Sequence, residues 1–271
     1  MKALPKYFQN AGYAEIAAGR LGYYVVASIG ALSALVLWRG LKSGRPAARE
    51  AEKSIGALIK EGIGAAREPG VALSYMSAFV SRSDLAVVGV FLTIWVSKAG
   101  RASGMDSATA AKKAGAVLAV AGISYLITAP LIGIFTDRFD RVKALIFASF
   151  FGFVAYTSAI FVTNPLTGMI YVVILLVGAA QIFGVITSQV LMSQQAPAEI
   201  RGSVIGFFGL CGAAAQILLG FVGGQLFDKW TEAGPFVLVG LFNLALAFAA
   251  LILRPRVRAP EQTEGGFIGG H

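Results

Sequence analysis

Long apolar runs alternate with short polar segments along the whole chain. A helix that crosses a bilayer needs about 20 mostly apolar residues, with a range of about 17–25. Seven runs meet this requirement, and they cover residues 21–38, 73–96, 115–135, 145–162, 168–191, 204–227 and 235–253. The pattern therefore predicts an all-α membrane protein with about seven transmembrane helices.

The fourth and fifth runs are separated by turn residues rather than by charge. Residues 144–198 contain no charged side chain. Within that stretch Asn164 precedes Pro165, and asparagine favours turns while proline ends a helix. We therefore predict two helices here, joined by a very short loop.

The longest polar stretch, residues 39–70, contains a helical pattern of its own. Its apolar residues recur at helical spacing, at Ile55, Leu58, Ile59 and Ile63, with acidic and basic residues between them. This pattern is typical of a short amphipathic helix on a membrane surface, and we expect Pro69-Gly70 to end it. The predicted organisation is an outer segment with the first helix (1–38), this loop (39–70), a six-helix bundle (71–253) and a disordered tail (254–271).

Composition favours a membrane protein over a soluble or nucleic-acid-binding one. Hydrophobic residues make up 56% of the 271 residues and charged residues 14%, and the mean hydropathy is +0.73. Soluble domains carry about 25% charged residues, so a lipid-facing surface explains the deficit. The net charge is +9. Because the basic residues stand in short segments between apolar runs, they fit membrane topology and not a nucleic-acid interface.

Residues that usually carry catalysis or bind metals are scarce. Cys211 is the only cysteine and lies in an apolar run, and His271, the only histidine, is the last residue. A lone cysteine forms neither a disulfide nor a thiolate metal site within one chain. Asp84 is the only acidic residue inside a predicted span. We therefore expect no metal, no cofactor and no enzymatic site.

The distribution of lysine and arginine predicts the orientation. If the 39–70 loop lies in the cytoplasm, fourteen of the 23 basic residues lie on the cytoplasmic side and eight outside, with Arg82 within a span. Cytoplasmic loops carry the excess of basic residues. We therefore predict a multi-pass protein of the cytoplasmic (inner) membrane, with its N-terminus outside and its C-terminus in the cytoplasm. The basic residues of the 98–113 loop run against this bias.

A short motif recurs three helices apart. The third run ends at residues 133–139 with Gly-Ile-Phe-Thr-Asp-Arg-Phe, and the sixth ends at residues 224–230 with Gly-Gln-Leu-Phe-Asp-Lys-Trp. Both read glycine, three residues, aspartate, a basic residue and an aromatic residue. In the predicted topology the two copies face opposite sides of the membrane. They therefore predict two inverted three-helix repeats, as in many transporters, preceded by one extra helix and a long cytoplasmic loop.

At the first copy of this motif the chain resembles the major facilitator superfamily. That family has twelve helices in two halves joined by a long cytoplasmic loop, and its loop between helices two and three, echoed between eight and nine, carries glycine, three residues, aspartate and basic residues. The matching residues here are Gly133, Asp137, Arg138, Arg141 and Lys143. Asp140 departs from the pattern, because the family usually has a second glycine there.

The resemblance implies an incomplete transporter. The first helix resembles the family's helix six, the 39–70 loop its central loop, and the other six helices its helices seven to twelve. The N-terminal half would then be missing, or a second subunit would replace it. The implied function is secondary active transport of a small solute by alternating access, as a symporter or antiporter coupled to an ion such as H⁺. Asp137, Arg138 and Arg141 would belong to a charge network that locks the inward gate.

Arg82 and Asp84 are candidate functional residues because they lie deep in the second run. An ionisable group at that depth is costly unless it faces protein or water. Two positions apart on a helix, their side chains point about 200° away from each other and do not pair directly. We expect one face to meet a substrate cavity and the other a neighbouring helix. Arg82 would hold an anionic solute group or Asp84 a coupling proton; the alternative is a structural interhelical ion pair.

Uncharged polar residues in the spans form a second set of candidates. In lipid, such groups either bond across helices or line a wet cavity. The candidates for a cavity are Tyr125, Gln181, Gln189 and Gln216. Gln181 and Gln216 lie nearest the middle of their runs.

Two other protein classes also fit part of the pattern. A natural seven-helix receptor matches the helix count, although a retinal protein needs a lysine in its last helix and residues 235–253 contain none. A natural half-transporter acting as a dimer is the second alternative. The expected partners in the transporter class are the lipid bilayer, a small-molecule substrate and a coupling ion, with no nucleic acid.

Overall fold

The computed structural model describes residues 15–40 and 54–257, and these residues are helical with short connections. The chain divides into two units, Met1–Lys53 and Ser54–His271. In the first unit the described part is one helix, α2 (Glu15–Gly40), which contains an apolar span from Tyr23 to Gly40.

The second unit holds six further helices long and apolar enough to cross a membrane. The second span consists of α4 (Pro69–Ala86), a π-helical segment η1 (Val87–Leu92) and α5 (Thr93–Ala102). The next three are α6 (Ser107–Arg138), α7 (Arg141–Thr157) extended by η2 (Ser158–Phe161), and α8 (Met169–Gln195). The sixth span follows the short η3 (Ala198–Ile200) and consists of α9 (Arg201–Leu218), a π-helical segment η4 (Leu219–Gly223) and α10 (Gly224–Lys229). The last is α11 (Gly234–Leu253), followed by η5 (Arg254–Arg256).

The prediction of an all-α membrane protein with about seven spans is thus confirmed. Several spans are longer than the apolar runs. The second covers Pro69–Ala102 instead of 73–96, and α6 covers Ser107–Arg138 instead of 115–135. The added turns carry charged and small residues that favour helix once a neighbouring apolar turn has formed.

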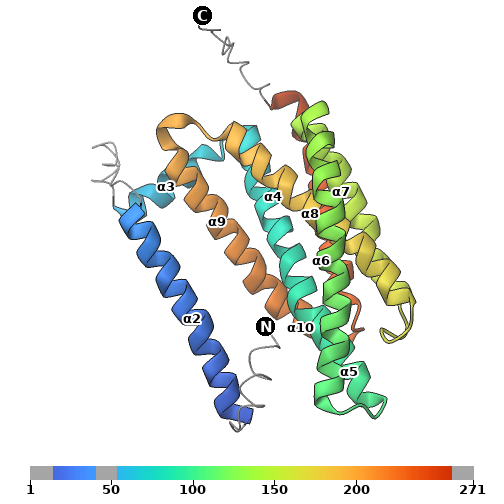
Figure 1. Ribbon diagram of the computed structural model, residues 1–271. Helices are drawn as coiled ribbons and strands as arrows, with labels where there is room; N and C mark the ends of the chain where they lie inside the picture. The colour runs from blue at the N-terminus through green and yellow to red at the C-terminus, as the bar shows by residue number, and fades with distance from the viewer. Residues whose placement is uncertain (1–14, 41–53, 258–271) are drawn as a thin grey trace, which may run out of the picture. The chain divides into compact units, whose positions relative to one another are not determined.

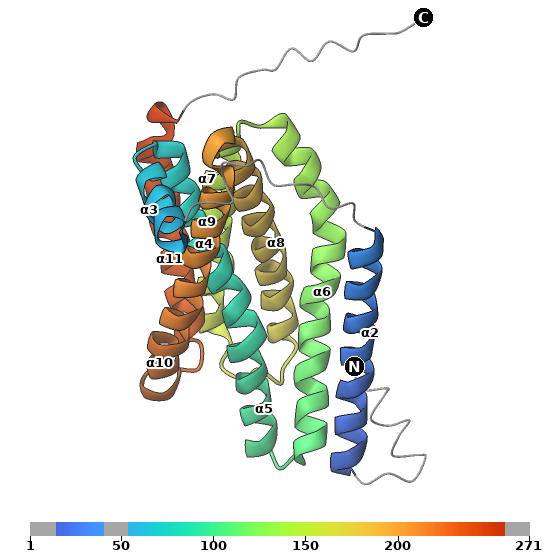
Figure 2. The same cartoon turned by 90° about the vertical axis from the view of Figure 1, so that its left-hand side faces the viewer.

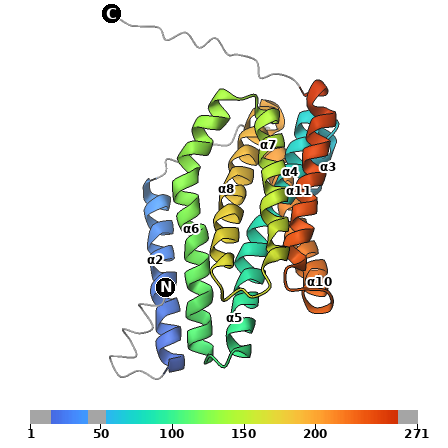
Figure 3. The same cartoon turned by 90° about the vertical axis from the view of Figure 1, so that its right-hand side faces the viewer.

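The six spans of the second unit form two layers. Figure 1 shows α9, α4, α8 and α6 in that order across the view, and each packs against the next, so they make a front layer. Behind them α7 and α11 run side by side (Figure 3), packed on α8 and α4 respectively. The second span changes neighbour along its length, because α4 packs on α9 whereas α5 packs on α6.

These contacts repeat in pairs. Let α4 correspond to α8, α6 to α9 and α7 to α11. The packing of α6 on α8 then corresponds to the packing of α9 on α4. The packing of α7 on α8 likewise becomes that of α11 on α4. The two copies of the sequence motif lie at the end of α6 and at α10, toward opposite ends of the bundle (Figure 1). The arrangement therefore fits the predicted inverted three-helix repeats.

A short helix, α3 (Ile55–Ala65), lies at the position of the amphipathic pattern and packs against α9 (Figure 2). The Tyr75 hydroxyl donates a hydrogen bond to the Gly62 carbonyl at 2.9 Å, and the Ser203 hydroxyl donates to a Glu61 carboxylate oxygen at 2.5 Å. A Cβ on Gly62 would lie 2.7 Å from the Cβ of Phe207. The glycine therefore permits this close packing.

The opposite side of α3 is apolar and exposed. Ile55, Ile59 and Ile63 recur every fourth residue and are 78%, 39% and 53% exposed. The prediction that Pro69-Gly70 ends this helix is wrong, because α3 ends at Ala65 and Pro69 begins α4. Proline fits the first turn of a helix, where its missing N–H has no intrahelical partner.

Substitutions at two glycines of α3 test this packing. Gly62→Ala places a methyl group against Phe207 and should destabilise the bundle by about 1–3 kcal/mol. Gly64→Ala is the matched control, because a Cβ there meets no atom within 4 Å and alanine favours a helix by roughly 0.5–1 kcal/mol. Thermal unfolding in one detergent should therefore give a lower midpoint for Gly62→Ala and an equal or higher one for Gly64→Ala. Equal midpoints for both variants would contradict the packing.

Candidate functional site

Asp84 lies at the centre of the bundle and is 1% exposed. It stands one turn before the π-helical segment η1, and its Oδ1 accepts a hydrogen bond from Asn243 Nδ2 of α11 at 3.0 Å. The same amide group donates to the Val239 carbonyl at 3.1 Å. Among the described residues Asp84 is the charged side chain that is fully buried, and it forms no salt bridge there.

Small residues allow the helices to meet at this point. A Cβ on Gly152 of α7 would lie 2.5 Å from Asn243 Oδ1. A Cβ on Gly184 of α8 would lie 3.3 Å from Asp84 Oδ2. The carboxyl and amide groups therefore occupy space that side chains on α7 and α8 would otherwise fill.

Three further polar side chains lie on the helices that pack around Asp84. Tyr125 of α6 and Tyr156 of α7 both interact electrostatically with Asp84. Gln181 stands three residues before Gly184 on α8, so it lies on the same side of that helix. Tyr156 and Gln181 are 0% and 2% exposed, and neither Tyr156 Oη nor Gln181 Oε1 has a hydrogen-bond partner in the described chain.

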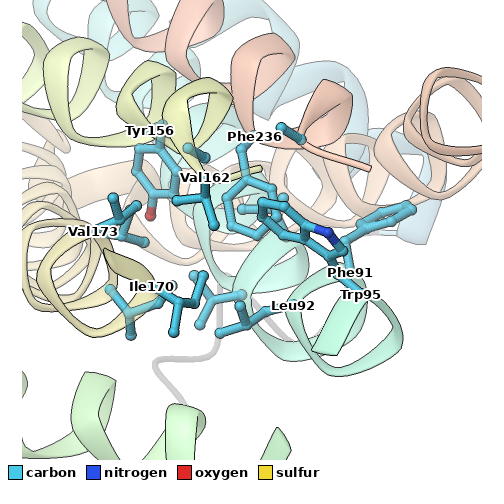
Figure 4. Packing of buried hydrophobic residues seen from close by; sticks show 14 of the residues in the cluster. Phe91, Leu92, Trp95, Tyr156, Val162, Ile170, Val173 and Phe236 are labelled. Carbon is cyan, nitrogen blue, oxygen red and sulfur yellow. The ribbon is translucent and has the colours of Figure 1, made fainter. Parts of the chain in front are cut away.

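The neighbourhood of Tyr156 is otherwise apolar. Figure 4 shows its ring among Val162, Val173 and Phe236, with the hydroxyl oxygen close to Val173. The cluster continues through Trp95, whose ring centroid lies 5.8 Å from that of Phe236. We call Asp84, Asn243, Tyr125, Tyr156 and Gln181 the polar centre. The ring of Tyr156 belongs to this apolar cluster.

Arg82 points away from the polar centre and is exposed. A Cβ on Gly212 of α9 would lie 2.5 Å from Arg82 Cγ, so the arginine stem passes close to α9 at this glycine. Gln216, one turn after Gly212, is also exposed, and so is Gln189 on α8. The structure thus buries Asp84 and Gln181 and leaves Tyr125 partly exposed within electrostatic reach of Asp84. It leaves Arg82, Gln189 and Gln216 on the surface.

The motif between α6 and α7 forms a tight two-residue connection. Asp140, which departs from the family pattern, caps α7, because its carboxylate accepts a hydrogen bond from the Lys143 N–H at 3.1 Å. The Arg141 guanidinium donates to the Thr136 carbonyl. Gly133 has open space where a Cβ would stand, and Arg138 and Lys143 are exposed. Asp137 is the residue before Arg138, the last residue of α6. The side chain of Asp137 lies outside the described part of the structure.

A salt bridge joins the second span to the loop before α11. Lys98 Nζ lies 2.9 Å from Glu232 Oε1 and 5.3 Å from the Phe227 ring centroid. The hydrogen bond from Lys98 lowers the pKa of Glu232. Both side chains are partly exposed, so the pair contributes little to stability. It marks the end of the second span opposite α3.

Two apolar clefts open between the helices. One of about 420 Å³ lies between α4, α9 and α11 and includes Tyr75, Phe79, Cys211 and Phe242. The other, of about 440 Å³, lies between α6, α7 and α8 and includes Thr128, Phe135 and Phe183. No charged residue lines either cleft. They are therefore distinct from the polar centre.

Comparison with known families identifies the fold. The sequence model of the Major Facilitator Superfamily matches residues 11–218 and, in a second overlapping match, residues 74–269. The chain belongs to the Major Facilitator Superfamily. The resemblance seen at the Gly133–Arg138 motif is therefore confirmed over most of the sequence.

Curated relatives include magnetosome proteins. The chain is 31% identical to the magnetosome protein MamH of Paramagnetospirillum magneticum over 199 residues, which are 73% of this chain and 45% of MamH. It is 26% identical to the magnetosome protein MamZ of Magnetospirillum gryphiswaldense over 187 residues, which are 69% of this chain and 29% of MamZ. The chain thus spans less than half the length of these relatives. No solved structure matches it.

Two residues of the polar centre, Asn243 and Tyr156, were not among the site candidates predicted from the sequence. Asn243 is one of several polar residues in the spans, and only the α4–α11 contact shows that it meets Asp84. Tyr156 lies in an apolar run where tyrosine serves equally well for packing. Nothing in that run distinguishes Tyr156 from a packing residue.

Proposed function

We propose that the chain forms one half of a transporter that moves a small solute across a membrane by alternating access, driven by an ion gradient, and we assign it no enzymatic role. The family assignment, the apolar spans and the paired helix contacts support this proposal. The observation that carries it is the exposed Arg82 on the front layer. A second half, either an N-terminal half or another subunit, would cover this layer.

The depth of Arg82 makes an exposed position there costly in lipid. It lies thirteen residues after Pro69, the first residue of α4, which corresponds to about 20 Å along the helix. The hydrocarbon core is about 30 Å thick, so the guanidinium belongs near its interior. A charge at that depth faces water or protein. This argument supports a water-filled cavity between the front layer and the second half.

The chemistry of Arg82 indicates the class of solute. Guanidinium groups bind carboxylates and phosphates through paired hydrogen bonds. Gln216 and Gln189 add amide groups on the same layer. We therefore propose an anionic solute with a carboxylate or phosphate group.

The open space at Gly133 and the exposed Arg138 and Lys143 support a gate at which the second half closes against the α6–α7 connection.

The relatives also suggest where the protein acts. Because two of them are magnetosome proteins, we propose that this chain resides in a magnetosome membrane. A fluorescent fusion in a magnetosome-forming host should follow the purified magnetosome fraction. A fusion confined to the cytoplasmic membrane would overturn this location and support the cytoplasmic (inner) membrane predicted from the sequence.

Thiol accessibility tests the cavity. In a Cys211→Ala chain, Arg82→Cys should react with a charged, membrane-impermeant methanethiosulfonate reagent in native membranes, because water reaches it. Val154→Cys is the matched control, since Val154 is 60% exposed and lies equally far, thirteen residues, from the start of α7 in the rear layer. It should not react, because it faces lipid. Equal labelling at the two positions, or none at Arg82→Cys, would argue against a cavity on the front layer.

Anion flux tests the role of Arg82. Citrate and inorganic phosphate serve as radiolabelled probes in vesicles that contain the full chain with its native partners. Arg82→Gln should lower the uptake of the carried probe by about 10–100-fold, which corresponds to the loss of charge-assisted hydrogen bonds worth about 1.5–3 kcal/mol. Arg101→Gln, at the exposed end of the same span, should leave uptake unchanged. Uptake equal to that of vesicles lacking the chain would count against the anionic class.

A further inference from the structure

The polar centre contains a carboxyl group without a positive partner. Asp84 is buried, forms no salt bridge among the described residues, and accepts a hydrogen bond from Asn243. A bare carboxylate in a membrane interior is strongly disfavoured, and buried ionisable groups either pair with an opposite charge or lose their own. The environment of Asp84 therefore needs a bound cation.

The helices around Asp84 bring neutral groups toward it. The titratable groups close enough to interact electrostatically with Asp84 are Tyr125 from α6 and Tyr156 from α7. From α11 comes the Asn243 amide, and α8 contributes Gly184 and Gln181. On its own helix, Arg82 is exposed. On α9, Arg201 is exposed at the first residue of the helix, and Cys211 interacts with Tyr75. The described residues thus supply no positive charge for this carboxylate.

The hydrogen-bond inventory favours a proton over a larger cation. The Asn243 amide serves Oδ1, while Oδ2 lies against Gly184, on the side of α8 that carries Gln181. Gln181 Oε1 is buried and lacks a donor. A neutral carboxylic acid provides one O–H donor, directed at Gln181 itself or at one bridging water. A buried carbonyl oxygen without a donor is destabilising, so protonation of Asp84 would remove the buried charge and offer Gln181 a donor.

We propose that Asp84, buried between α4, α8 and α11 and held by the Asn243 amide, is a proton-binding site, and that it carries its proton in the conformation described here. The proton enters from water on one side of the membrane and leaves to water on the other. Its release leaves a carboxylate that only a hydrated centre stabilises. The adjacent segment Val87–Leu92 is π-helical, a form of helix that is frequent at functional sites. Proton release thus favours opening of the bundle at this level.

Infrared spectroscopy of the full chain in lipid vesicles tests the bound proton directly. The wild-type chain at neutral pH should show the C=O stretching band of a protonated carboxylic acid, which shifts in D₂O. Asp84→Asn should abolish this band, and Glu199→Gln, which removes an exposed carboxylate, should keep it. Asn243→Leu should move its frequency, because the hydrogen bond to Oδ1 is lost. A wild-type spectrum without the band, or a band that survives in Asp84→Asn, overturns the proposal.

The carboxyl chemical shift of aspartate tests the bound proton without a substitution and also distinguishes it from a metal cation. If Asp84→Asn does not fold, the carboxyl chemical shift of ¹³C-aspartate in the wild-type chain reports the same proton without any substitution. A carboxylate shift that responds to added Na⁺ or Mg²⁺ overturns the proposal in favour of a metal cation.

The role of this proton as coupling ion rests on the proposed transport function. With a carried anion as probe, a gradient of one pH unit should change wild-type accumulation by up to about tenfold for one coupled proton. Asp84→Asn should lose this response and retain exchange without a gradient. An unchanged response overturns the coupling role. Absence of flux in the wild type overturns the transport proposal and leaves the spectroscopic result to stand by itself.

Discussion

The hydrogen bond from Asn243 to Asp84 ties the two layers of the bundle together. It joins α11 in the rear layer to α4 in the front layer. It forms because Gly152 and Gly184 leave room for the amide and carboxyl groups on the neighbouring helices. A methyl group at Gly152 would occupy the position of the Asn243 amide oxygen, so the backbones of α7 and α11 approach closely where the polar group sits. Close approach of small residues is the usual basis of helix packing in lipid.

The inverted repeats give this contact its place at the centre. Exchanging the two repeats maps α4 onto α8 and α7 onto α11, and these are the helices that converge at Asp84. The Asn243–Asp84 hydrogen bond joins α11 of one proposed repeat to α4 of the other. In the proposed mechanism, a change in the charge of Asp84 would therefore act on both repeats.

The sequence predicted the spans well because each is decided by local composition. It also separated the two faces of α4, since a spacing of two residues alone places Arg82 and Asp84 on different sides of a helix. It did not predict which helix meets each face. Asn243, Tyr156 and Gly152 acquire their roles only through contacts between segments far apart in the chain. Pro69 was misassigned for a related reason, because proline that ends one helix and proline that begins the next look alike in a short turn.

The second span crosses the front layer obliquely, from the α9 edge at α4 to the α6 edge at α5. It contains 34 residues, or about 50 Å of helix, and a helix longer than the bilayer core is accommodated by tilt. Because this one helical span packs on α9 at its first end and on α6 at its other end, a change in its tilt would alter both contacts, and Asp84 lies between them.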